Sequence, residues 1–186
     1  MKFRLAGSTR ELRKLASQLR NAGSDSVLRH LSDNLAEEGL SLIEEGFATE
    51  TDPDGNKWAP KVFPDGRQVL VGKTTRLRRG WHRKYVAAVG FSIAASVVDA
   101  KWQQEGTGIY GPRHTPIRPV KAKVLSFTVQ RAAGKGKWKS GRVFANSVKG
   151  APPRRMIPSG KKLPEKWQRA FRAAMHDFWV SYFSKR

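Results

Sequence analysis

Apolar residues recur at helical spacing near both ends of the chain. Three leucines follow the capping box Ser8-Thr9-Arg10-Glu11, which predicts a first helix over about 9–21. A second amphipathic run predicts a long helix over about 25–48 with four glutamates on its polar face. After Pro164, aromatic residues at helical spacing predict a last helix over 164–183, with its stripe in the core or at a subunit interface.

The middle of the chain changes to short runs of β-branched and aromatic residues. Val69–Val71, Tyr85–Gly90 and Phe91–Val98 have the composition of strands. Asp99–Glu105 fits one short helical turn, and the Gly- and Pro-rich segment 106–120 predicts a loop.

Alternating apolar and polar residues mark a hairpin further along. Lys123–Val129 and Arg142–Val148 both alternate, and the basic, Gly-containing segment 131–141 between them predicts a long, flexible tip. We therefore predict an α+β fold in a single domain, 1–186. The N-terminal helix pair, within 8–48, and the helix over 164–183 pack a central, mostly antiparallel sheet within 68–130 and 142–148, and the hairpin forms an arm.

The charge distribution divides the chain. Residues 1–65 hold 9 Lys/Arg and 11 Asp/Glu, whereas residues 66–186 hold 27 Lys/Arg and only 4 Asp/Glu. Between Glu105 and Glu165 there are 14 Lys/Arg and no acidic residue. Because such a surface repels itself, it favours an anionic partner: nucleic acid, an acidic protein or an acidic membrane surface. A solvated basic face kept for solubility is the alternative, but such faces usually mix the two signs.

Several classes of protein are disfavoured by what the sequence lacks. No apolar run approaches the roughly 20 residues of a membrane span, and the N-terminus has no signal-peptide core. The absence of cysteine excludes disulfides and thiol catalysis. These features predict a cytosolic protein that does not enter a membrane.

Catalytic chemistry is also disfavoured. The four histidines show no paired spacing, and no phosphate-loop or nucleophile-elbow motif occurs. Asp52, Pro53, Asp54 and Gly55 fit a turn rather than a metal site. A nuclease would need clustered carboxylates, which the basic half lacks. We predict no catalytic residue, no metal, no cofactor and no enzyme activity.

Two clusters of basic residues with an aromatic residue among them are candidates for binding phosphates, stacking bases or docking on an acidic subunit. The predicted interaction residues are Arg76, Arg78, Arg79, Arg83, Lys84, Lys135, Lys137, Trp138, Lys139, Arg154 and Arg155.

The order of motifs resembles the phage virion morphogenesis family, which includes tail-completion proteins of contractile-tailed phages. The motifs are Asp52-Pro53-Asp54-Gly55-Asn56-Lys57-Trp58, the segment Leu70–Leu77, Ala100-Lys101-Trp102-Gln103-Gln104-Glu105-Gly106, the strand Lys123–Phe127 and Pro153-Arg154-Arg155-Met156-Ile157-Pro158. Asp52, Pro53, Asp54, Gly55, Trp58, Gln104 and Gly106 are its structural motif residues.

This resemblance implies a virion structural protein, a tail terminator. It would form a ring, expected to be a hexamer, that caps the tail tube at the neck and joins it to the head. The implied partners are further copies of the chain, tail-tube and head-connector proteins, and the DNA in the lumen. The alternative is a stand-alone basic nucleic-acid-binding protein.

Overall fold

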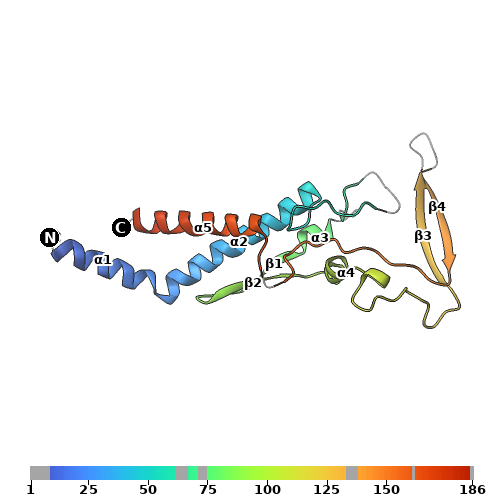
Figure 1. The fold of residues 1–186 in the computed structure, drawn as a ribbon, viewed down its shortest axis with the longest axis horizontal. Helices are drawn as coiled ribbons and strands as arrows, with labels where there is room; N and C mark the ends of the chain where they lie inside the picture. The colour runs from blue at the N-terminus through green and yellow to red at the C-terminus, as the bar shows by residue number, and fades with distance from the viewer. Residues whose placement is uncertain (1–8, 62–66, 71–74, 133–137, 161, 185–186) are drawn as a thin grey trace, which may run out of the picture. The chain divides into compact units, whose positions relative to one another are not determined.

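The structure, a computed structural model, describes residues 9–61, 67–70, 75–132, 138–160 and 162–184 (Figure 1). The predicted terminal helices are confirmed, as is the helical turn before Gly106. The helices are α1 (Thr9–Ala22), α2 (Asp25–Thr49), α3 (Arg76–Arg79), α4 (Asp99–Glu105) and α5 (Glu165–Ser184), with the 3-10 turn η1 (Gly108–Tyr110).

The strands form two separate hairpins. β1 (Trp81–Ala87) pairs with β2 (Gly90–Ala95), and β3 (Leu125–Ala132) pairs antiparallel with β4 (Trp138–Ala145). The α+β class is therefore confirmed. The predicted central sheet is wrong for the described residues, since each two-stranded sheet stays on its own. Residue alternation identifies a strand but does not specify which strand it pairs with.

Four predicted strands need correction. Val69 and Leu70 lie in a turn, where Leu70 has a φ of 62°, and Val71 lies outside the described residues. The first hairpin turns at Ala88 and Val89, before Gly90. The residues at 96–98 follow the end of β2, and those at 146–148 follow the end of β4.

The hairpin strands extend into the segment that was predicted to be a flexible tip. Residues 131–132 belong to β3 and residues 138–141 belong to β4, with Arg131 paired to Lys139. The remaining tip residues, 133–137, lie outside the described residues. Within the described part, the predicted tip is therefore largely strand.

The chain divides into two compact units. Unit 1 comprises 1–39, 83–94 and 169–186, and unit 2 comprises 40–82 and 95–168. Helices α2 and α5 each contribute residues to both units. A single folding domain over 1–186 stays a prediction, because compactness does not measure independent folding.

Unit 1 is organised around a glycine of α2. A Cβ atom at Gly39 would lie 2.7 Å from Ile93 Cδ1 and 3.8 Å from rings of Phe91 and Phe171. These two phenylalanines, on β2 and α5, meet edge to face with ring centroids 5.9 Å apart. The absence of a side chain at Gly39 thus lets β2 and α5 approach α2, and Figure 1 shows α5 alongside α2.

Unit 2 has a core of large apolar side chains from both sequence halves. Phe47 is fully buried near the end of α2, and Trp58 and Trp167 are nearly so. Burial of an aromatic side chain of this size stabilises the folded state by about 1.5–3 kcal/mol. The remaining buried members are Leu42, Ile43, Ala100 and Met156.

Among the helices that the structure describes, none combines the length and apolar character needed to cross a bilayer.

Candidate functional site

The Asp-Pro-Asp-Gly motif forms a closed turn after α2. One oxygen of the Asp52 carboxylate accepts hydrogen bonds from the backbone N–H groups of Asp54 (3.0 Å) and Asn56 (2.8 Å). Gly55 occupies a φ of 91°, which glycine adopts without steric cost. A β-bridge between Thr51 and Lys57 closes the base of the turn. The Asp52 carboxylate therefore stabilises the turn itself.

The turn places Trp58 in the core of unit 2. Its indole lies edge to face against Phe47, with ring centroids 5.4 Å apart. The indole N–H donates to the carbonyl of Arg155 at 2.9 Å. The Arg155 guanidinium returns to the turn, with Nη1 3.8 Å from Asp54 Oδ2. Trp58 thus joins the turn to the Pro-Arg-Arg motif.

Gln104 joins the same motif to α4. Its side-chain N–H donates to the Ile157 carbonyl at 2.7 Å, and its Oε1 accepts from the backbone N–H of Met156 at 2.8 Å. Gly106 follows with a φ of 79°, and its backbone lies against Tyr110 and Ala151. The amide of Gln104 thus uses both its donor and its acceptor on the backbone of the Pro-Arg-Arg motif.

Arg154 points into the interior of unit 2. Its Nε donates to the Ala59 carbonyl at 2.8 Å, its Nη2 to the Pro60 carbonyl at 3.0 Å and its Nη1 to Gln103 Oε1 at 3.4 Å. The residue is only 7% exposed, and burial lowers the pKa of its guanidinium. Arg154 therefore holds the chain at 59–60 against α4.

Three motifs that are far apart in sequence thus form one hydrogen-bonded assembly, here called the motif cluster. It consists of the turn 52–55 with Trp58, the segment 103–106, and Arg154 with Arg155. Its polar groups bond mainly to the chain's own backbone. The predicted structural residues Asp52, Gly55, Trp58, Gln104 and Gly106 all lie within it.

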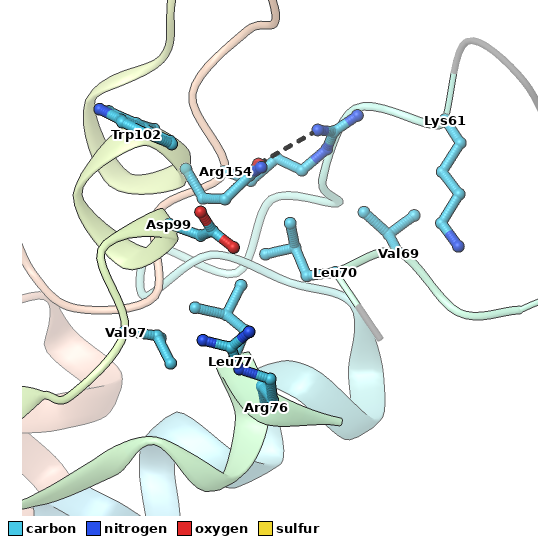
Figure 2. Close-up of a pocket in the computed structure, with 10 residues that line it drawn as sticks. Lys61, Val69, Leu70, Arg76, Leu77, Val97, Asp99, Trp102 and Arg154 are labelled. Carbon is cyan, nitrogen blue, oxygen red and sulfur yellow. Dashed lines mark hydrogen bonds between the residues drawn. The ribbon is translucent and has the colours of Figure 1, made fainter. Parts of the chain in front are cut away.

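An open pocket of about 400 Å³ lies beside the motif cluster (Figure 2). Leu70, Leu77 and Val97 supply apolar lining, whereas Arg76 and Asp99 supply charge. Trp102 of α4 also lines it and is 53% exposed. The sequence analysis did not single out Asp99 or Trp102 as site residues. The mixed charge of this lining indicates no particular ligand.

Part of the first predicted basic cluster is neutralised within the chain. Arg78 pairs with Glu44 at 2.6 Å. Arg83 pairs with Asp33 and, at 3.1 Å, with Glu37. The exposed residues of this cluster that form no ion pair with any residue in the described part of the chain are Arg76, Arg79 and Lys84.

The second predicted cluster lies on the β3–β4 hairpin. Trp138 and Lys139 belong to β4 by their backbone pairing. Lys135 and Lys137 lie outside the described residues. The first predicted basic cluster therefore lies on α3 and β1, and the described residues of the second lie on β4.

A further set of exposed cations surrounds this hairpin, here called the cationic track. None of its members forms an ion pair with any residue that the structure describes. They are Arg113, Arg118, Lys121, Lys123, Arg142 and Lys149. Among these residues, the sequence pattern pointed to Arg142 as part of the basic cluster around Trp138, and the acid-free stretch between Glu105 and Glu165 contains them all.

No metal-binding group of three or more His, Asp or Glu side chains exists within the described residues. His82 and His114 each place Nδ1 3.2 Å from a nearby backbone carbonyl oxygen. The contacts seen for both histidines are therefore local contacts with the backbone.

Comparison of the chain with models of known protein families, with curated proteins and with solved structures finds no match. The resemblance to the phage virion morphogenesis family stays a prediction.

Proposed function

We propose that the chain is a non-enzymatic virion protein of the tail-completion type. It forms a ring at the neck of a contractile-tailed phage, caps the tail tube and joins it to the head. The motif cluster carries this proposal, because the motifs that resemble the family act together as one scaffold although about 100 residues separate the first from the last.

Exposed apolar side chains support self-association. Phe144 on β4 is 61% exposed, and Phe127 on β3 is 37% exposed. An isolated two-stranded hairpin is at best marginally stable in water, so burial against another chain would stabilise it. Val180 and Phe183 near the end of α5 are likewise exposed. We assign these surfaces to contacts between copies and with the tail-tube and connector proteins.

Light scattering coupled to size-exclusion chromatography tests the ring. A hexamer would have six times the mass of the 20.8 kDa chain. Replacing Phe127 by Ser should shift the mass towards that of the monomer, whereas replacing exposed Val89 on the first hairpin is the matched control. A wild-type chain that stays monomeric at high concentration and is absent from purified virions would refute this function.

The cationic track favours a second candidate, a stand-alone nucleic-acid-binding protein. That candidate predicts DNA binding by a monomer and no place in the virion. Proteomic detection of the chain in purified particles would separate the two.

A further inference from the structure

The two faces of the β3–β4 hairpin differ in chemistry. The antiparallel register sets Ser126 opposite Phe144 and Thr128 opposite Arg142. Since successive strand residues point to opposite sides, these four residues share one face, here called the Arg142 face. The other face, here called the Phe127 face, carries Leu125, Phe127, Val143 and Ala145.

Exposure differs between the two faces. All four residues of the Arg142 face are exposed, whereas on the Phe127 face Leu125, Val143 and Ala145 are half-buried and Phe127 is exposed. The Arg142 face offers a guanidinium, two hydroxyl groups and an aromatic ring, with no carboxylate. Arginine and hydroxyl side chains are frequent donors to phosphate oxygens.

The loop before β3 extends this chemistry. Ile117 and Val148 exchange two backbone hydrogen bonds of 2.9 Å, which tie the loop to the chain that leaves β4. Arg118 and Lys149 directly follow these two paired residues, and Lys121 and Lys123 lie between the pair and β3. The cationic track therefore continues from the hairpin onto the adjoining loop.

The segment that supplies these cations carries charge of one sign. No acidic residue occurs from 106 to 164, so none of the segment's own side chains is a carboxylate. A protein partner carries charges of both signs, whereas a nucleic-acid backbone carries negative charge alone at regular intervals. A segment that carries cations alone therefore suits a polyphosphate better than a protein.

Several carboxylates of a second copy would already be engaged within that copy. Glu44 is paired with Arg78, Glu45 with Lys166, and Asp33 and Glu37 with Arg83. Asp52 is bound within its own turn. These carboxylates would have to break internal contacts before they could meet the track of another copy.

The dimensions of the hairpin suit one form of nucleic acid. Neighbouring strands lie about 4.8 Å apart, and the major groove of B-form DNA, about 12 Å wide, admits a two-stranded ribbon. The major groove of an RNA duplex is deep and narrow and excludes such a ribbon.

We propose that the Arg142 face, with Lys121 and Lys123 of the adjoining loop, binds the backbone of duplex DNA. Arg142, Ser126 and Thr128 donate to phosphate oxygens, and the Phe144 ring lies against the sugar or a base edge. This binding goes beyond a structural role in a ring and holds for a single copy of the chain.

Fluorescence anisotropy with a labelled DNA duplex and the full chain tests this site. Wild-type affinity should fall by about fortyfold between about 50 and 200 mM salt, as for roughly three phosphates neutralised by Arg142, Lys121 and Lys123. Arg142→Gln should weaken binding and reduce the slope of log affinity against log salt by about one. Phe144→Ala should weaken binding several-fold, whereas Phe127→Ala, the same change on the other face, should not. Amide hydrogen exchange of β3 and β4 shows whether each variant keeps its strand pairing.

Three results would overturn the proposal. If Arg142→Gln leaves the slope of log affinity against log salt unchanged while β3 and β4 stay paired, the Arg142 face does not contact phosphate. Equal affinity for an RNA duplex would exclude insertion in the major groove. Stronger binding of poly-glutamate than of DNA at equal charge would assign the surface to an acidic protein. Because monomeric fractions serve in the assay, none of these results depends on ring formation.

Discussion

Replacement of Trp58 by Ala tests whether the motif cluster holds unit 2 together. The indole is 94% buried, lies against the Phe47 ring and donates to the Arg155 carbonyl at 2.9 Å. Removing a buried Trp typically costs about 3–5 kcal/mol, a range that includes the cavity left behind. The Arg155 carbonyl would also lose its partner, so we expect the upper part of this range. Urea unfolding followed by far-ultraviolet circular dichroism measures the change in free energy of unfolding.

Two further variants separate the contributions. Trp58→Phe keeps most of the ring contact but loses the hydrogen bond, so it should cost about 1–3 kcal/mol. Trp102→Ala, in the same unit, removes an indole that is 53% exposed and should cost below about 1 kcal/mol. If Trp58→Ala destabilises the protein no more than Trp102→Ala, the packing role assigned to Trp58 is refuted.

Three other changes test separate features. Arg154→Met leaves the carbonyls of Ala59 and Pro60 without their donor and should lower the free energy of unfolding in urea by about 2–4 kcal/mol. An unchanged free energy of unfolding would contradict the role of Arg154 in holding residues 59–60 against α4. Gly108→Ala places a Cβ atom 2.1 Å from the Lys149 carbonyl oxygen and should lower the melting temperature, whereas Gly141→Ala, with open space around it, should not; equal melting temperatures would be inconsistent with the close approach. Replacing all three tip lysines by Glu should leave circular dichroism unchanged but block assembly in size-exclusion chromatography, and normal assembly would rule out the predicted role of the arm; the lysines are Lys135, Lys137 and Lys139.

Local signals in the sequence were sufficient for α1, α2, α4 and α5, although not for the short helix α3, which no pattern predicted. The capping box before α1, the spacing of leucines and glutamates along α2, and Pro164 before α5 all lie within a few residues of the feature they specify. The same holds for the Asp52 turn, because its hydrogen bonds reach only two to four residues along the chain. Such features depend on backbone geometry near one residue, which nearby side chains largely determine.

The candidate site was only partly predictable, because its contacts join residues that lie far apart in the sequence. The sequence identified Arg154 as a basic residue near the end of the chain and suggested an exposed contact. In the structure its guanidinium bonds to carbonyls at 59 and 60, more than 90 residues away. Arg78 and Arg83 similarly meet acids of α2 that lie 34 and 50 residues earlier. Charge alone does not reveal whether a cation finds a partner inside the chain.

The sequence by itself determined the α+β class, the helices other than α3, and the acid-free stretch from 106 to 164, since each depends on composition or on short-range periodicity. Only the tertiary structure decided that the strands form two separate hairpins, that distant motifs join in one cluster, and which cations stay exposed. These outcomes depend on contacts between residues far apart in sequence, where packing and hydrogen-bond satisfaction select one partner among many compatible with the same local pattern.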